Sequence, residues 1–238
     1  LNMNSYDDIT AELSALGSEE KRRVLQRFFK TGEGQYGHGD RFMGIPVPVT
    51  RGVAKKHKGI TTAEAGALLA SEWHEVRLCG LLIMGEKMKK AAPGEARLIY
   101  DTYLANTARI NNWDLVDLSA PQVVGTYLLD RPHDDLYRLA GSPLLWDNRI
   151  AIVSTFTFIK KGLLDDTFAL ALRLMSHSHE LIHKAAGWML REAGKRDFDR
   201  LHAFVGMHHA EMPRTMLRYA IEKYPEDERR RVLDMGRK

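Results

Sequence analysis

Trp113 and Asp117 are the two residues whose types and spacing best suit a chemical role. They belong to the segment Asn-Asn-Trp-Asp-Leu-Val-Asp at residues 111–117. Residues four apart on a helix lie on one face, so the indole and the carboxylate would be neighbours while Asp114 points elsewhere. An aromatic face beside an anion suits a cationic ligand. The structural alternative is a tryptophan that anchors the core and an acid near a helix start.

Tryptophans and basic residues form two similar pairs further along the chain. Trp188 follows Lys184 by four residues, and Arg149 follows Trp146 by three, so each pair shares a helix face. The structural alternatives are core positions for Trp146 and Trp188 and an ion pair between Arg149 and Asp117. If the helices stack in register, both pairs would lie along the same wall as residues 111–117.

The histidines and the single cysteine match no recognised catalytic or metal-binding motif. His-Glu-x-x-His and Gly-x-Ser-x-Gly are absent, which leaves zinc hydrolase and serine esterase chemistry without support. Cys79 lies in an apolar run and is expected to be a core thiol in a reducing compartment. We expect no metal site, because acids at ligand spacing do not accompany the closest histidine groups, His177, His179, His183 and the pair His208 and His209.

The charge of +4 and the pI near 9.1 permit an anionic partner without requiring one. Basic clusters stand at residues 55–58, 87–90, 160–161 and 229–231, each near an expected helix end. The helix dipole favours cations there in any case. No apolar stretch approaches the roughly 20 residues of a membrane span, and the N-terminus does not read as a signal peptide. We therefore expect a soluble, cytoplasmic protein.

Apolar residues from residue 61 onward predict a helical chain. They recur at three- and four-residue spacing, with few alternating β-branched runs, and breaks rich in Gly, Pro or Asn separate the segments. Capping signals mark the helix starts at Thr61 with Glu64, Pro93, Asp165 and Pro213. Glycines typical of helix ends stand at Gly17 and Gly194.

The N-terminal part has a different pattern. Helices are expected at residues 7–16 and 19–29, followed by a glycine-rich loop at residues 30–40. This loop is not expected to bind phosphate, because no strand precedes it and the Gly-Lys-Ser/Thr ending is absent. Pro46 and Pro48 should hold an extended stretch before the next helix.

The expected helices come in pairs, and the second helix of each pair carries a charged residue before an apolar stretch. These residues recur at intervals of 30 to 40, as Arg77, Asp117, Arg149, Lys184 and Arg214. Helical hairpins of this period build HEAT and armadillo solenoids. We predict one all-α domain over residues 1–238, with N-terminal helices and the loop at 1–60 and HEAT/ARM-like repeats at 61–238. The repeats would form a right-handed superhelical solenoid whose second helices line a concave face.

Three segments carry a family resemblance. They are Asn-Trp-Asp-Leu-Val-Asp at residues 112–117, Arg-Ile-Ala at 149–151, and Lys-Ala-Ala-Gly-Trp-Met-Leu-Arg-Glu at 184–192. In these segments the chain resembles the AlkD-type DNA alkylation repair glycosylases, which are built from HEAT-like repeats. The likeness extends to residues 29–48 and 212–220 and so covers nearly the whole chain.

The resemblance implies that the chain releases positively charged N3- and N7-alkylated purines from duplex DNA. It implies that Asp117 is the catalytic aspartate and that Trp113 and Trp188 flank the lesion, which stays stacked instead of being flipped into a pocket. Arg149 matches an arginine at the DNA backbone beside the lesion. An N-terminal aromatic also belongs to the family's site in some members, and its candidates here are Phe28, Phe29 and Tyr36.

The chemistry of a cationic purine agrees with this assignment. Its glycosidic bond is already weak and its base leaves without a general acid, so a carboxylate need only stabilise the oxocarbenium-like sugar and orient water. No metal or cofactor is required, and the absence of a well-placed lysine argues for a monofunctional enzyme. Basic residues on the wall would contact DNA phosphates, with Arg77, Lys184, Arg191, Arg214 and Arg218 as candidates beside Arg149.

Two other functions stay open at this stage. One is a non-catalytic HEAT-repeat scaffold that binds DNA or protein, and the other is a family member that binds unusual DNA structures without excision. Asp117→Asn separates them, since it should abolish an enzyme while sparing DNA binding. We expect a monomer whose partner is double-stranded DNA.

Overall fold

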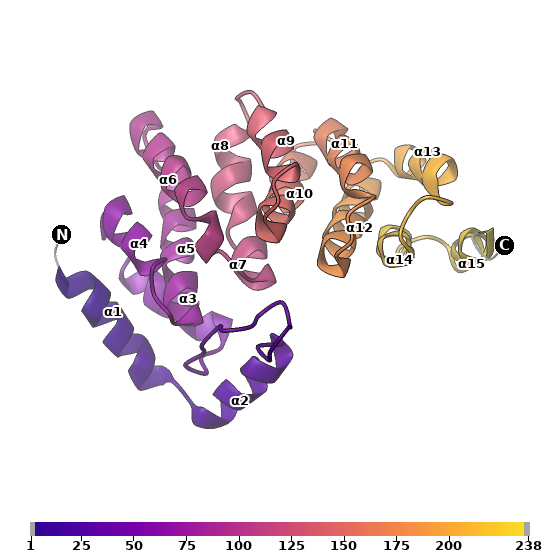
Figure 1. The fold of residues 1–238 in the computed structure, drawn as a ribbon. Coiled ribbons are helices and arrows are strands. Elements are labelled where there is room, and N and C mark those ends of the chain that lie inside the picture. The colour runs from indigo at the N-terminus through magenta and orange to yellow at the C-terminus, as the bar shows by residue number, and fades with distance from the viewer. Residues whose placement is uncertain (1–2, 236–238) are drawn as a thin grey trace. The chain divides into compact units, whose positions relative to one another are not determined.

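The computed structural model describes residues 3–235, whose helices group into two compact units, Leu1–Tyr127 and Leu128–Lys238 (Figure 1). The prediction of an all-α chain is confirmed, because no β-strand occurs between residues 3 and 235. Over the same range, no helix combines the length and the apolarity that a membrane span requires. The single-domain organisation stays a prediction.

The first unit is built around α5 (His74–Met88), a helix that is buried along nearly its whole length. It packs against α1, α3, α4, α6, α7 and the π-helical segment η2. The other elements of the unit are α1 (Met3–Leu16), α2 (Glu19–Phe28), α3 (Val47–Lys56), α4 (Thr62–Leu68), α6 (Pro93–Ala105), the 3-10 turn η1 (Thr107–Arg109), α7 (Trp113–Asp117) and η2 (Pro121–Gly125), with α8 (Thr126–Leu128) at its end.

The second unit consists of helices that pack in succession. Its elements are α9 (Asp134–Ala140), α10 (Leu145–Lys160), α11 (Asp165–Leu174), α12 (Glu180–Gly194), α13 (Phe198–His208), α14 (Arg214–Ala220) and α15 (Glu226–Met235). Helix α10 packs on α12 and α12 packs on α14. Helix α9 covers α10, α11 covers both α10 and α12, and α13 covers α12. This order is the one expected of helical-hairpin repeats. The right-handed superhelical path stays a prediction.

Local sequence signals account for most helix boundaries. Thr61 and Glu64 form the predicted capping box, in which each side chain bonds the other residue's backbone N–H. Helix α6 begins at Pro93, as predicted. The extended stretch predicted through Pro48 is wrong, because α3 begins at Val47 and proline is tolerated in a first helical turn.

Helix α12 ends at Gly194, in agreement with the predicted helix end. A Cβ at this position would lie 2.3 Å from the Leu201 side chain, so the glycine serves close packing against α13. Gly44 is required for its backbone, with a φ of 86° and a hypothetical Cβ only 2.1 Å from the carbonyl oxygen of Ser18. It lets the segment before α3 lie against the start of α2.

Cys79 is fully buried in α5, as the sequence predicted for a core thiol. Burial raises the pKa of this thiol to about 12. The side chain therefore acts as a small apolar group in the core of the first unit, on the same helix as His74 and Glu75.

Candidate active site

A cavity of about 320 Å³ lies within the first unit. Residues from α2, from the segment before α3, from α5 and from α7 form its wall. Most of the wall is apolar, and four large aromatic side chains contribute to it: Phe28, Phe29, Phe42 and Trp113. The titratable side chains of the wall are His74, Glu75, Asp114 and Asp117.

Aromatic contacts fix the indole of Trp113 at this cavity. The ring stacks on Phe29 with centroids 5.1 Å apart and an interplanar angle of 26°. Phe28 meets it edge-on at 5.8 Å. The indole N–H donates a hydrogen bond of 3.3 Å to the Tyr36 hydroxyl. All three N-terminal aromatic candidates are therefore grouped around Trp113.

Helix α7 places Asp117 one turn after Trp113, and both side chains line the cavity. The prediction that they share a face is confirmed. The Asn112 side chain caps this short helix by accepting a hydrogen bond of 2.9 Å from the Trp113 backbone N–H. The prediction that Asp114 points elsewhere is wrong, because this residue also lines the cavity and its carboxylate is bonded to His74.

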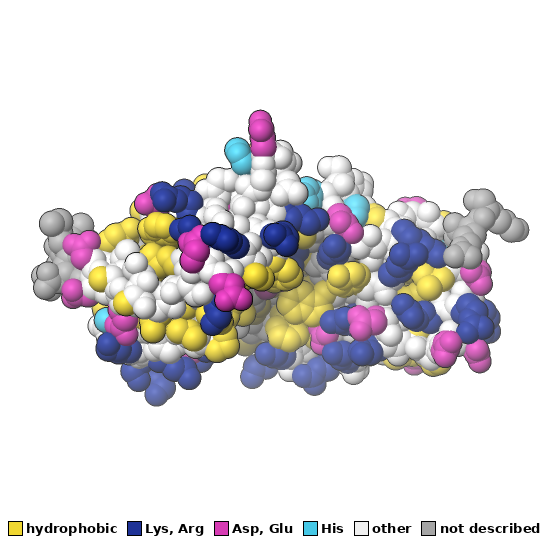
Figure 2. Space-filling model, turned by 90° about the horizontal axis from the view of Figure 1, so that it is seen from below, with side chains coloured by type: hydrophobic (Ala, Val, Ile, Leu, Met, Phe, Trp, Pro, Cys, Tyr) yellow, Lys and Arg dark blue, Asp and Glu magenta, His cyan; other side chains and the backbone are white. Residues whose placement is uncertain are grey.

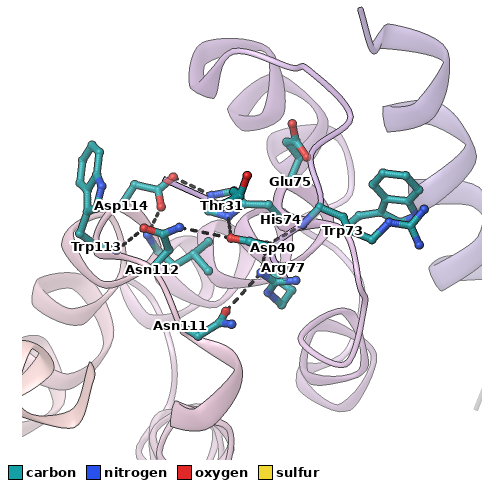
Figure 3. Close-up of polar contacts among 12 residues, drawn as sticks. Thr31, Asp40, Trp73, His74, Glu75, Arg77, Asn111, Asn112, Trp113 and Asp114 are labelled. Atoms are coloured by element: carbon teal, nitrogen blue, oxygen red, sulfur yellow. Dashed lines mark hydrogen bonds and ion pairs between the residues drawn. The ribbon is translucent and has the colours of Figure 1, made fainter. Parts of the chain in front are cut away.

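A buried polar network lies behind α7 (Figure 3). The His74 ring bridges two carboxylates, with Nδ1 2.7 Å from Asp40 Oδ2 and Nε2 2.8 Å from Asp114 Oδ2. Asp40 also accepts hydrogen bonds from the Arg77 guanidinium at 2.6 Å and from the Asn112 amide at 3.2 Å. Sequence spacing does not reveal this network, because its members come from three separate segments.

Charge interactions in the network set its protonation state. Burial alone would lower the pKa of His74, but the Asp114 and Asp40 carboxylates outweigh it and raise this pKa to about 9. Burial would likewise raise the pKa of Asp40, but His74 and Arg77 lower it to about 2. At neutral pH the His74 ring is therefore an imidazolium that donates from both nitrogens, to Asp40 and to Asp114.

Glu75 organises the segment before α3. Its buried carboxylate accepts hydrogen bonds from the backbone N–H groups of Met43, Gly44 and Ile45 at 2.9, 2.9 and 3.2 Å. A carboxylate that satisfies three backbone donors holds their segment in one conformation. Glu75 thus fixes the part of the wall that Phe42 and Ile45 provide.

Comparison with known proteins identifies the family. A family model described as "DNA alkylation repair enzyme" matches residues 9–224. The chain belongs to the DNA alkylation repair enzyme family. Its fold is similar to that of a solved structure, "Predicted DNA alkylation repair enzyme from Enterococcus faecalis", with a TM-score of 0.70 and 16% sequence identity over 88% of this chain and 97% of that one. No curated protein sequence matches the chain significantly.

Family membership supports a role in DNA repair and DNA as the partner. Except for Arg77, the basic residues that the sequence predicts as DNA contacts lie in the second unit. Lys184 is 3.3 Å from Glu180, and Arg191 forms ion pairs with Glu192 and Glu222. Arg214 and Arg218 stand on α14, where Arg214 is half-buried and Arg218 is exposed.

Arg149 and the two tryptophans of the second unit are less accessible. Arg149 is 5% exposed and donates a hydrogen bond of 2.6 Å to the Leu181 carbonyl. Trp188 is half-buried, and its ring lies 5.8 Å from that of Phe156. Trp146 is buried, in agreement with its structural alternative as a core residue.

The structure corrects the expectation that Arg77 contacts a DNA phosphate. This side chain is 2% exposed, and its guanidinium bonds Asp40, the Ser71 carbonyl and the Asn111 side chain. A group buried among such partners does not reach a DNA backbone. Repeat spacing identified a real helix position, but that position faces the core.

Proposed function

We propose that this chain is a monofunctional DNA glycosylase that hydrolyses the N-glycosidic bond of cationic N3- or N7-alkylated purines in duplex DNA. One observation carries the proposal: the Asp117 carboxylate and the Trp113 indole stand one helical turn apart in the wall of an apolar, aromatic-lined cavity. A DNA alkylation repair family member with an anion and an aromatic face at one cavity is suited to a cationic base or sugar.

The reaction needs little proton transfer to the leaving group. The bond between the sugar C1′ and the purine nitrogen breaks, its electron pair neutralises the cationic base, and positive charge develops on the sugar. Asp117 lies among apolar groups, where its attraction for that charge exceeds the attraction expected in water. Water then adds to C1′ and gives up a proton, for which Asp117 is the acceptor.

The N-terminal aromatic that we propose for substrate contact is Phe28. This side chain is 60% exposed and still lines the cavity, so it can meet a ligand at the opening. Phe29 is 5% exposed behind the Trp113 ring, and the Tyr36 hydroxyl is bonded to the indole N–H. We propose Trp188 of the second unit as the second aromatic at the lesion.

Basic side chains on α12 and α14 would bind the DNA backbone. On the face in Figure 2, Lys and Arg side chains lie among Asp, Glu and exposed apolar side chains. Arg218 is exposed and Lys184 partly so, while Arg149 needs to leave its buried position before it can contact a phosphate. Such contacts are independent of sequence and weaken steeply with salt. We propose Lys184, Arg191, Arg214 and Arg218 for this role.

The test is release of 7-methylguanine and 3-methyladenine from methylated duplex DNA, without added metal, by the wild type and by Asp117→Asn. Asp101→Asn is the matched control, because it makes the same change at an exposed residue of the same unit. We expect release by the wild type and Asp101→Asn and none by Asp117→Asn. DNA binding by Asp117→Asn should persist or improve, since a negative charge is removed. A folded wild type that releases no base would overturn the proposal and favour a non-catalytic scaffold.

A further inference from the structure

His74 joins three segments of the first unit that are far apart in the sequence. Asp40 ends the glycine-rich loop, His74 begins α5, and Asp114 lies in the first turn of α7 (Figure 3). We propose that His74 is a positioning residue for base excision, which holds α7 so that Trp113 and Asp117 keep their places at the cavity. The proposal rests on the glycosylase function proposed above.

The bridge is buried and its acceptors are fully engaged. The side chains of Asp40, His74 and Asp114 are 1%, 2% and 6% exposed. The second oxygen of Asp40 accepts from Arg77 and from the Arg41 backbone N–H, and that of Asp114 accepts from the Leu115 backbone N–H. A buried carboxylate left without its partner is costly, so each bond holds its segment in place.

Helix α7 depends on such anchors because it has only five residues. A helix this short gains too few internal hydrogen bonds to fix its own conformation. Its first turn is held by the Asn112 cap and by the Asp114 carboxylate, and both groups meet the network around His74. Loss of the bridge would therefore allow Asp117, at the other end of α7, to move.

A second route connects His74 to Trp113 through aromatic rings. The imidazole stacks on Phe42 with centroids 4.3 Å apart and lies 5.2 Å from Phe29. Phe29 in turn stacks on the Trp113 indole. The His74 ring thus supports the Trp113 indole through ring packing. It supports the Asp117 carboxylate by holding the backbone of α7 in place.

The bridge requires both ring nitrogens to carry protons, which makes it sensitive to pH. The charged groups recorded at the ring are Asp40 from the loop, Arg77 from α5 and Asp114 from α7. The neighbouring Glu75 directs its carboxylate to backbone donors instead. When His74 loses a proton at high pH, one of the two carboxylates loses its donor.

Asp114→Asn changes this requirement while keeping the geometry of the bridge. The amide of Asn can donate to Nε2 of a neutral ring, and its carbonyl can accept from the Leu115 N–H as Asp114 does now. The ring then needs only the proton that it donates to Asp40. For this variant, the shape of the pH profile of the base-release rate constant is compared with that of the wild type, and its absolute rate at neutral pH is not used.

The experiment measures single-turnover base release and duplex DNA affinity for the wild type, His74→Gln and the matched control His38→Gln at an exposed site. We expect His74→Gln to lower the rate constant by about 10- to 100-fold, since small displacements of a reacting group have effects of that size. Its Kd should change less than about twofold. A folded His74→Gln protein with the wild-type rate constant, or one that loses affinity in parallel, overturns the proposal.

The pH profile tests the same inference without reliance on the folding of His74→Gln. The wild-type rate constant should fall as the pH rises through about 9, whereas that of Asp114→Asn should not fall there. Profiles of equal shape overturn the proposal. If the wild type releases no base, the proposed glycosylase function is wrong, and the positioning role of His74 needs a separate test. That test is the NMR signal of the Trp113 indole N–H, which is assigned by comparison with Trp113→Phe. That signal should shift in His74→Gln, and an unchanged signal overturns the inference.

Discussion

Asp40 and Asp114 are joined by a single imidazole ring that lies 2.7 Å from one carboxylate and 2.8 Å from the other. One aspartate closes the glycine-rich loop and the other opens α7, so the ring makes the N-terminal segment part of the site wall. The loop also supplies Tyr36, whose hydroxyl meets the Trp113 indole. The glycine-rich loop is therefore a structural support for the site.

The stability of the first unit should depend on the charge of His74. Because its pKa in the folded chain is raised from 6.5 to about 9, the stabilisation is fully present below pH 6.5 and is lost as the pH rises through 9. We expect the free energy of unfolding to fall by up to about 3 kcal/mol between pH 7 and pH 10. Urea unfolding at several pH values measures it. Asp114→Asn should show a smaller decrease, and equal decreases would contradict the assignment.

Phe28 and Phe29 should respond differently to truncation. Phe28→Ala should reduce base release while changing stability by less than about 0.5 kcal/mol, because the side chain is 60% exposed. Phe29→Ala should destabilise by about 3 to 5 kcal/mol, because the ring packs between His74, Phe42 and Trp113. Urea unfolding and single-turnover assays on both variants check this. A large stability loss in Phe28→Ala would contradict its role at the opening.

Arg218 should contribute to DNA affinity through charge alone. Arg218→Ala should weaken duplex binding about equally for all sequences and reduce the slope of log K against log salt by about 1. Arg97→Ala on α6, where an exposed arginine pairs with Asp101, is the matched control. Fluorescence anisotropy over a salt series measures both slopes. The same loss from both variants would point to net charge instead of a specific contact.

Arg77→Ala should behave as a stability variant. It leaves the buried Asp40 carboxylate without its closest guanidinium partner, which costs about 3 to 5 kcal/mol. The fraction that remains folded should bind DNA with wild-type salt dependence. Urea unfolding and a salt series separate the two effects, and a reduced salt slope with unchanged stability would restore Arg77 as a phosphate contact.

The amino-acid sequence predicted the structural features that depend on residues close together in the chain. The capping box at Thr61 and the shared face of Trp113 and Asp117 follow from spacings of three and four, so they could be recognised locally. The bridge at His74 could not, because it depends on how the glycine-rich loop packs against α5 and α7. The prediction of a surface position for Arg77 fails for a related reason: a repeat interval fixes the position of a residue along a helix but does not determine its burial.

The buried network behind α7 has a consequence for selectivity. Asp40 and Asp114 contribute two negative charges, and His74 and Arg77 contribute two positive ones, so the group as a whole is electrically neutral. A polyanion that approaches the site meets no net repulsion from these supporting residues. Asp117 lies outside this neutral group and adds its carboxylate to the cavity wall. In the proposed reaction, this carboxylate would attract a cationic purine more strongly than a normal, uncharged one. The charge of the damaged base would then contribute to selectivity in addition to its shape.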